Sequence, residues 1–305
     1  MKRIMITGGT GFIGSHCLDL LVDFPHEIYA TYRNVDDTFK HDRINWIPLD
    51  LSAHDQVYLT LKDIQPTHLL HLAWTMSSGI KLNSPVHHHW FNTSRMLVRA
   101  FREHGGERMV VAGSAAEYGV VNEICVERKT PLNPDTDFGR SKKDLFRWIE
   151  DYGKQYSVSY GWGRLFFLFG PREAPGRFIP YVISSMLAGD IVKTTYARQV
   201  QDYLYVEDAA RALIKLLFSK YQGPINICSG APIQLSDIIE KIAHMIPGDH
   251  KIIFGAVPTS PHDYQFMVGD EGQLRRELDF VPRYELKTGL MNAIGALRKE
   301  NAVKY

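Results

Sequence analysis

Cysteine is scarce in this chain of 305 residues, which has three: Cys17, Cys125 and Cys228. Their wide spacing and odd number argue against a disulfide framework and favour a reducing compartment. Long apolar runs are also missing, since the run 165–169 is far shorter than a membrane span. The first residues lead directly into an apolar strand, which leaves no room for a signal peptide. We therefore predict a cytoplasmic protein.

An excess of charge of one sign is lacking as well. The chain has 35 Lys and Arg against 34 Asp and Glu, a net charge of +1. Without a long-range field, neither nucleic acid nor an anionic membrane is an expected partner. The composition is 45% hydrophobic and 23% charged, and the length suits one large or two medium domains with a substantial core.

A glycine-rich stretch, TGGTGFIG at residues 7–14, organises the beginning of the chain. It follows the apolar run 4–6 and precedes a segment with helical periodicity, so a strand turns through glycines into a helix. Bare backbone N–H groups and a positive helix end then meet at one point, which suits a pyrophosphate. The pattern predicts dinucleotide binding by Gly8, Thr10, Gly11, Phe12, Ile13 and Gly14.

The second expected strand, residues 27–32, lacks the acidic residue that usually follows it in NAD sites. That acid accepts hydrogen bonds from the adenosine ribose, but Tyr32 and Arg33 stand here and the next acid is Asp36. An arginine pairs well with a 2′-phosphate. This favours NADP over NAD, with NAD as the alternative; a solvated surface arginine is the plain interpretation of Arg33.

Strand and helix patterns continue to alternate, with further strands at 44–49, 68–73 and 108–113. This alternation predicts a Rossmann-type, doubly wound parallel sheet. We expect a dinucleotide-binding domain at 1–172, to which 201–228 return. Residues 173–200 and 229–305 would form a smaller C-terminal α/β lobe that binds substrate in the cleft between lobes. The His87-His88-His89 run lacks a completing acid or cysteine nearby, so we expect no metal site.

Several further motifs resemble the extended short-chain dehydrogenase/reductases that act on nucleotide sugars. They are residues 50–51 (DL), 71–73 (HLA), Ser114 four residues before Tyr118-Gly119, 138–142 (FGRSK), 170–171 (GP), 202–208 (DYLYVED) and 226–230 (NICSG). The match covers nearly the whole chain. It implies cofactor contacts from Asp50, Leu51, Leu72, Ala73 and Lys142, and a homodimer formed by helices near 90–104 and 141–156.

The resemblance also implies a catalytic set of a hydroxyl residue, a tyrosine and a lysine. Ser114 and Lys142 occupy two of these positions, but Phe138 occupies the tyrosine position. Phenylalanine has no ionisable group, so the expected proton relay is interrupted. Either a tyrosine-containing enzyme has been altered, which the intact Ser114 and Lys142 favour, or the natural protein is catalytically unusual; Tyr118 or a water is a possible substitute.

The residues after Ser114 narrow the reaction that the resemblance implies. Related 4,6-dehydratases carry an Asp-Glu pair there, and related 3,5-epimerases carry a cysteine at the second position, whereas this chain has Ala115-Ala116. With dehydration and 3,5-epimerisation set aside, simple hydride transfer at one carbon is the reaction that the resemblance implies. With NADPH favoured, the prediction is reduction of a nucleotide-linked 4-keto-6-deoxy sugar; the alternatives are a nucleotide-sugar 4-epimerase and a non-catalytic dinucleotide-binding protein. Substrate contacts are expected from Trp74, Ser114, Glu117, Tyr118, Arg177, Phe178 and Arg198.

Overall fold

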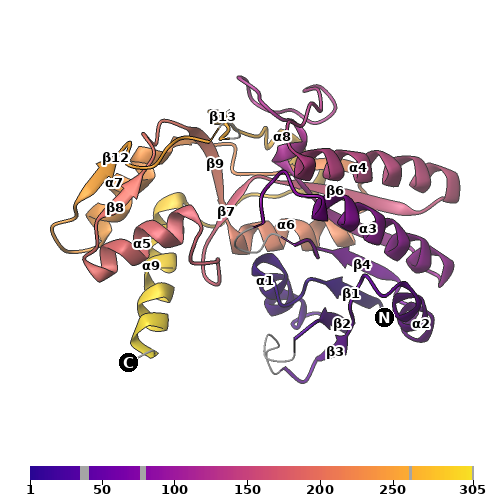
Figure 1. The fold of residues 1–305 in the computed structure, drawn as a ribbon. Coiled ribbons are helices and arrows are strands. Elements are labelled where there is room, and N and C mark those ends of the chain that lie inside the picture. The colour runs from indigo at the N-terminus through magenta and orange to yellow at the C-terminus, as the bar shows by residue number, and fades with distance from the viewer. Residues whose placement is uncertain (35–40, 76–79, 261–262, 304–305) are drawn as a thin grey trace.

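The computed structural model describes residues 1–34, 41–75, 80–260 and 263–303, and a seven-stranded parallel sheet forms its larger lobe (Figure 1). The strand order is β10-β6-β5-β4-β1-β2-β3, and every neighbouring pair is parallel. The strands are β1 (Arg3–Thr7), β2 (Glu27–Tyr32), β3 (Ile44–Pro48), β4 (His68–His71), β5 (Arg108–Ser114), β6 (Ser159–Leu165) and β10 (Gly223–Ile227). This confirms the predicted Rossmann-type sheet.

The order of the sheet reverses between β1 and β4, since successive strands run outward from β1 in both directions. Crevices at such a reversal, beyond the carboxyl ends of the strands, are where ligands bind in open α/β sheets. The glycine-rich stretch follows β1 and residues 72–75 follow β4, so the fold places both at this crevice.

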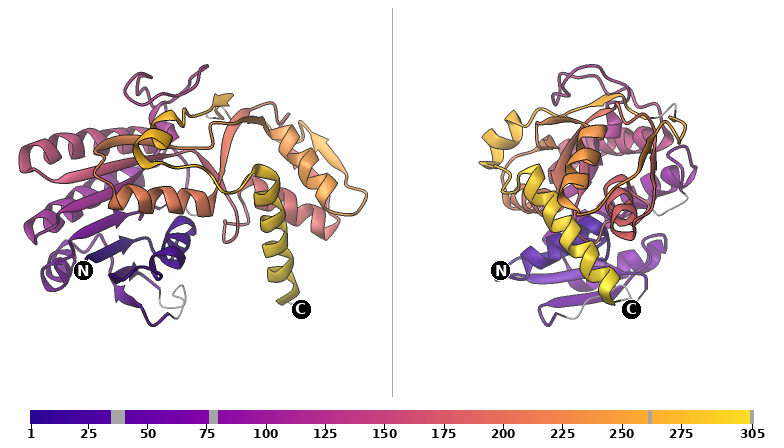
Figure 2. Two further views of the ribbon diagram at one scale, coloured as in Figure 1. Left: turned by 180° about the vertical axis from the view of Figure 1, so that it is seen from behind. Right: turned by 90° about the vertical axis from the view of Figure 1, so that its left-hand side faces the viewer.

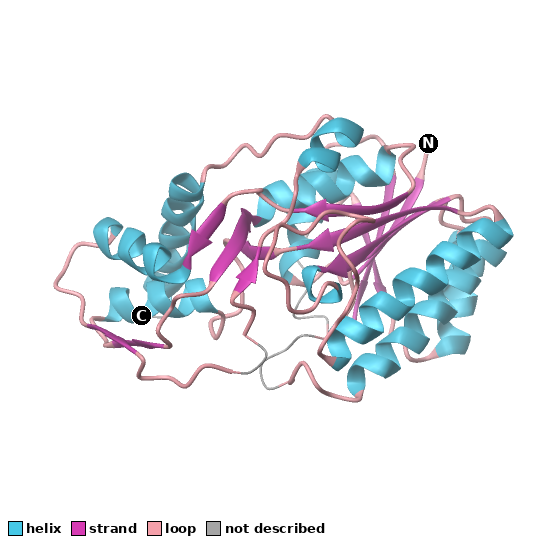
Figure 3. Ribbon diagram, turned by 90° about the horizontal axis from the view of Figure 1, so that it is seen from above, coloured by secondary structure: helices cyan, strands magenta, loops and turns pink. Residues whose placement is uncertain are grey.

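Helices cover both faces of the sheet, as the view along it shows (Figure 3). On one face α1 (Phe12–Leu21) packs beside α6 (Val206–Phe218), joined by α8 (Gly272–Leu278). On the other lie α2 (His54–Ile64), α3 (Val86–Glu103) and α4 (Asp137–Tyr156). Buried apolar side chains on both faces explain the continuous apolar runs of the strands. No helix in the described ranges is long and apolar enough to cross a membrane.

A smaller lobe follows β6 and forms the other end of the molecule (Figure 2). Its strand β9 (Val200–Tyr205) pairs with β7 (Phe167–Phe169), β11 (Pro232–Gln234) and β13 (Phe266–Met267), while β8 (Val192–Thr194) pairs with β12 (Ile252–Phe254). The helices α5 (Phe178–Ala188), α7 (Leu235–Met245) and α9 (Leu286–Val303) share its separate apolar core.

The chain divides between the lobes at different points from the predicted ones. Strands β7 and β9 belong to the small-lobe sheet, although 1–172 and 201–228 were expected in the larger lobe. Conversely, Leu274, Leu278 and Phe280 join the core of the larger lobe. Short strands continue directly from β6 and into α6, so the crossing points carry no linker that a composition change would reveal.

Candidate active site

The turn between β1 and α1 leaves no room for side chains at two of its glycines. Gly8 has φ +75°, and a Cβ there would lie 2.8 Å from the backbone nitrogen of Ala73. A Cβ on Gly14 would lie 2.0 Å from the Gly8 carbonyl oxygen. The turn closes through Gly11 N–H donating to Gly8 O at 3.0 Å. Glycine at these positions thus lets the turn pack closely against Ala73 and against itself, and Thr10, Gly11, Phe12 and Ile13 follow on its partly exposed rim. We call this turn, residues 7–14, the cradle.

A buried polar chain fixes the segment after β4 against this turn. Thr7 Oγ1 and His71 Nδ1 are 2.6 Å apart, and His71 Nε2 is 2.9 Å from Ser94 Oγ. The Ala73 backbone N–H donates to Thr7 Oγ1 at 3.4 Å. Leu72 and Ala73 therefore lie beside Gly8, where both were predicted to contact the dinucleotide.

Residues proposed for the adenosine end gather after β2 and β3. Arg33 is exposed just beyond β2, Asp50 is exposed beyond β3, and the next residue, Leu51, is buried. Hydrogen bonds from the Ser52 backbone and hydroxyl lower the pKa of Asp50, and the positive charge of Arg33 acts in the same direction. Asp50 holds a turn at Ser52 rather than capping α2.

Ser114 and Lys142 both belong to the carboxyl end of β5, one as its last residue and the other through a hydrogen bond to its backbone. Ser114 is the last residue of that strand, and Lys142 Nζ donates to the carbonyl oxygen of Ala112 at 2.7 Å. Lys142 is buried, and this burial lowers its pKa to about 7, against the opposing effect of Glu117. The structure thus brings two of the three predicted catalytic positions to one strand end.

Phe138 stands one helical turn before Lys142 on α4, so the two side chains are neighbours on the helix. The start of α4 is fixed by Thr136, whose hydroxyl accepts from Gly139 N–H, and by Phe138 N–H donating to the carbonyl of Leu82. The Phe138 ring is 9% exposed. It fills the tyrosine position with an apolar ring that cannot exchange a proton.

An aromatic cluster, which the sequence did not suggest as a unit, surrounds Phe138 and Lys142. The Trp74 ring centroid lies 3.8 Å from Lys142 Nζ, and the ring packs edge-on against Phe138 at 6.2 Å. Trp74 Nε1 donates to His87 Nδ1 at 3.2 Å, while Trp90 stacks on Trp74. Trp74 was predicted to contact substrate, and its position over Lys142 places it beside the predicted catalytic set.

Glu117 and Tyr118 were both predicted to contact substrate. The structure differs from this prediction, because both side chains are completely buried. Glu117 accepts from Arg164 Nε at 2.8 Å and from Ser114 N–H at 2.8 Å, within a capping box of the short 3-10 helix η2 (Ala115–Glu117). Tyr118 donates to Asn226 Oδ1 at 2.8 Å, and burial raises its pKa. These side chains support the end of β5 from inside, and Tyr118 is no substitute for the missing phenol.

The predicted substrate contacts of the small lobe lie at two places. Arg177 and Phe178 begin α5, whereas Arg198 is exposed between β8 and β9, with its guanidinium over the Tyr196 ring. Sequence reasoning missed Glu173, between β7 and α5. Burial raises its pKa to about 8, although Arg177 opposes this, and its Oε2 atom finds no hydrogen-bond partner within the described ranges. In the sequence, the feature that could have drawn attention to Glu173 is its position two residues after the Gly170-Pro171 motif.

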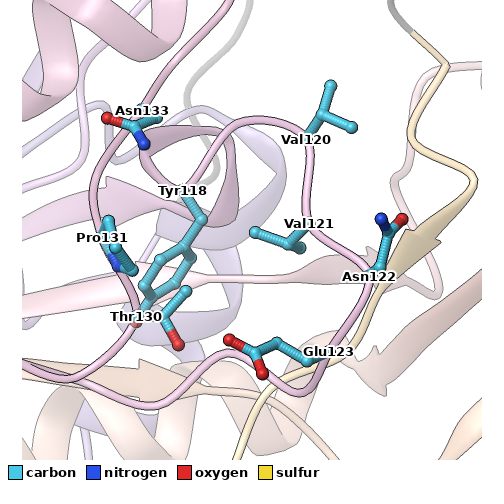
Figure 4. A pocket seen from close by; sticks show the side chains of 8 residues that line it. All are labelled: Tyr118, Val120, Val121, Asn122, Glu123, Thr130, Pro131 and Asn133. Carbon is cyan, nitrogen blue, oxygen red and sulfur yellow. The ribbon is translucent and has the colours of Figure 1, made fainter.

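A pocket of about 350 Å³ opens on the outer side of Tyr118 (Figure 4). The segment between η2 and α4 forms it, through Tyr118, Val120, Val121, Asn122, Glu123, Thr130, Pro131 and Asn133. Ser114, Phe138 and Lys142 do not line it. The pocket is accordingly separate from the predicted catalytic set.

The profile of the NAD dependent epimerase/dehydratase family matches residues 4–228. The chain belongs to this family, as the resemblance implied. It is 24% identical to a putative UDP-glucose 4-epimerase of Methanocaldococcus jannaschii, over 98% of this chain and 99% of that protein. No closer assignment to a single reaction follows from identity at this level.

Two solved structures show the same fold. UDP-glucose 4-epimerase from Thermotoga maritima, determined with UDP-glucose, superposes with a TM-score of 0.90 at 20% identity, covering 98% of this chain and 99% of that one. A tyrosine-to-phenylalanine mutant of UDP-glucuronic acid 4-epimerase from Bacillus cereus, in complex with UDP-4-deoxy-4-fluoro-glucuronic acid and NAD, gives a TM-score of 0.85 at 20% identity with the same coverage.

Proposed function

We propose that this chain binds a pyridine dinucleotide and a nucleotide-linked hexose and exchanges a hydride at C4 of the sugar, as a 4-epimerase does. The observation that carries the proposal is the hydrogen bond of Lys142 Nζ to Ala112, two residues before Ser114 ends β5, on the strand next to β4 at the crevice with the glycine cradle. The names of the similar proteins favour epimerisation over the 4-ketoreduction expected from the sequence.

Elimination chemistry has little support at this strand end. A dehydration needs acid and base groups next to the reacting carbon, but Ala115 and Ala116 are buried and apolar. The nearest carboxylate along the chain, Glu117, is occupied by Arg164 and Ser114 N–H. Hydride exchange without loss of a substituent is the chemistry that remains.

In this proposal, different residues bind the dinucleotide and act on the sugar. The cradle at Gly8, Gly11 and Gly14 and the positive end of α1 hold a pyrophosphate. Lys142 would bind a ribose hydroxyl of the dinucleotide, and the Ser114 hydroxyl would donate a hydrogen bond to the oxygen at the reacting carbon. When bound, the dinucleotide supplies the hydride acceptor and donor.

On the substrate side, Trp74 offers an aromatic face beside the reacting sugar. Arg177 and Arg198 offer cations for the diphosphate, and Phe178 a surface for the base. The aromatic face and the cations match the two chemically different ends of a nucleotide sugar.

The test restores the phenol. Phe138→Tyr is expected to interconvert UDP-glucose or UDP-N-acetylglucosamine with the 4-epimer in the presence of NAD, followed by NMR of the sugar protons. General acid–base groups contribute about 10²–10⁴-fold, so the unchanged chain should be slower by that order. If Phe138→Tyr binds NAD but epimerises no sugar of a broad panel, the epimerase proposal is wrong; if it also reduces no 4-keto sugar with NADPH, the chain is a non-catalytic dinucleotide-binding protein.

Arg33 favours a second candidate, NADPH-dependent reduction of a nucleotide-linked 4-keto-6-deoxy sugar. A reductase consumes NADPH in proportion to product, whereas an epimerase regenerates its dinucleotide in every cycle. Assays of Phe138→Tyr with a 4-keto sugar and NADPH, read at 340 nm, separate the two reactions. Stoichiometric NADPH oxidation without epimerisation of UDP-hexoses would replace the first candidate with the second.

A further inference from the structure

Lys142 has an unusual set of neighbours for a buried cation. One N–H of its ammonium reaches the Ala112 carbonyl, and the Trp74 ring lies across it at 3.8 Å. In the ranges that the structure describes, no carboxylate pairs with it. A buried ammonium with no anion is disfavoured, so the neutral amine becomes accessible near pH 7.

The groups that face Lys142 from the neighbouring elements do not supply a proton themselves. Glu117 on η2 favours the charged lysine from a distance but is held by Arg164. His71 on β4 has both ring nitrogens in hydrogen bonds, and burial and then the charge of Lys142 lower its pKa to about 3. Phe138, on the same helix, has no proton to exchange.

The His87 ring also lies beside Phe138, with the ring centroids 5.3 Å apart. It is completely buried, its Nδ1 accepts from Trp74, and its Nε2 lies 3.0 Å from the carbonyl of Lys81. The Nδ1 contact therefore holds Trp74, and the Nε2 contact holds His87 itself. This makes His87 a support for the aromatic cluster, and of these described groups Lys142 is left as the one that can exchange a proton.

We propose that Lys142 Nζ replaces the missing phenol as the group that exchanges the proton of the sugar C4 hydroxyl, through one intervening hydroxyl or water. The proposal rests on the proposed function. In the oxidising direction the neutral amine takes the proton and becomes an ammonium, while the C4 hydride passes to the bound dinucleotide and the carbon becomes a ketone. The reverse step returns the proton from the ammonium and the hydride to either face of the carbon.

Trp74 acts as a positioning residue in this scheme. Its ring shields one side of Nζ from bulk water, which favours the neutral amine, and its π face attracts the ammonium. Both protonation states of Lys142 are therefore accessible. His87 and Trp90 fix the ring from behind. The arrangement lets one nitrogen serve in both directions of a reversible proton transfer.

The first test measures the protonation of Lys142 directly, without turnover. Protein labelled with ¹⁵N-lysine is titrated by NMR, and the Nζ resonance missing from Lys142→Met gives the assignment. We expect a midpoint near 7, and a lower midpoint in Trp74→Leu, which removes the π face but keeps an apolar cover. An Nζ that stays protonated above pH 9 overturns the Lys142 proposal alone.

The second test uses Lys142→Arg, since an arginine keeps the cation but does not release its proton. In the Phe138 chain at saturating NAD, we expect it to lower the residual rate of hydride transfer by at least about tenfold and to remove the rise of that rate through pH 7. In the Phe138→Tyr background, where the phenol exchanges the proton, the loss should be clearly smaller.

The outcomes separate the two proposals. Equal losses in both backgrounds, or a residual rate unchanged by Lys142→Arg, show that Lys142 does not exchange the proton, while turnover by Phe138→Tyr still supports the proposed function. Absence of turnover in Phe138→Tyr overturns the proposed function and the catalytic role of Lys142 with it, even if the NMR midpoint is near 7.

Discussion

Arg164 on β6 donates from Nε to Oε2 of Glu117 across 2.8 Å, and both side chains are buried. Trp162 Nε1 donates to the same carboxylate at 2.9 Å, so Glu117 links two strands at the point where Ser114 ends β5. The ion pair is therefore part of the support for the candidate site.

Removing one partner of this ion pair should lower the free energy of unfolding more than replacing both partners with apolar residues. We expect Glu117→Leu alone to lower the free energy of unfolding by about 3–5 kcal/mol, because Arg164 is left as a buried unpaired charge. The double variant Glu117→Leu, Arg164→Leu should lose less than the single variant. Urea unfolding curves of the three proteins provide the measurement, and a single-variant loss below about 1 kcal/mol would contradict the role given to the pair.

Gly14→Ala should weaken dinucleotide binding strongly, because its Cβ would lie 2.0 Å from the Gly8 carbonyl oxygen. The shift that relieves this clash moves the cradle and costs about 1–3 kcal/mol of stability. Gly295→Ala in α9 is the matched control, since nothing lies within 4 Å of its Cβ position. Calorimetric titration with NAD should show normal binding for the control and at least tenfold weaker binding for Gly14→Ala.

Arg33 should decide the preference between phosphorylated and unphosphorylated dinucleotide. Removing a hydrogen-bonding cation opposite a phosphate costs about 1.5–3 kcal/mol, so Arg33→Ala is expected to weaken NADPH binding roughly 10–100-fold. NAD binding should stay nearly unchanged, and Arg33→Lys, which keeps the charge but loses the planar fork, should fall between. If NADPH and NAD weaken equally, Arg33 does not contact a 2′-phosphate.

The free energy of unfolding should fall as the pH rises from about 4.5 to about 8 because of Glu173. Burial raises its pKa in the folded state from 4.5 to about 8. Below this window both states are protonated; above it both are ionised, and the folded state carries the full cost of a buried carboxylate. Since the side chain is partly exposed, we expect only about 1–3 kcal/mol.

Glu173→Gln tests this slope. The variant should have a flatter dependence of stability on pH and should be more stable than the unchanged chain at pH 8, as measured by urea unfolding at several pH values. Arg177→Ala should steepen the slope, because the Arg177 charge opposes the rise of the Glu173 pKa. A Gln variant with the same slope as its parent would assign the effect to other groups.

The expected homodimer can be tested on α3 and α4. Met96 is 39% exposed and Tyr156 is 45% exposed, and Arg95 lies over the Trp148 ring between the two helices. If this face is the dimer interface, Met96→Glu should raise the dissociation constant at least tenfold, or about 1.4 kcal/mol. Val281→Glu, at a residue 57% exposed beyond α8, is the control. Sedimentation velocity at micromolar concentrations measures the dissociation of both variants, and a parent protein that is monomeric there would contradict the predicted homodimer.

Local patterns were enough to predict the sheet and the cradle, because both depend on neighbours in sequence: an apolar strand, then glycines, then a helix. The same holds for Phe138 and Lys142, which one helical turn brings together. The directions of Glu117 and Tyr118 could not be predicted, since their partners Arg164 and Asn226 come from distant strands. The contact between Trp74 and Lys142 likewise depends on how β4 and α4 pack, and periodicity carries no information about that.

The chain crosses repeatedly between the lobes: after β6, before α6, after β10, before α8 and again before α9. Neither lobe is therefore a continuous piece that could be expressed, exchanged or recombined by itself. Each stretch of the small lobe is held at both ends by the large one, apart from the terminal helix. Unfolding should accordingly be one cooperative transition. A substitution that destabilises the small-lobe core should also destabilise the cradle, because the chain connects the two lobes at several points.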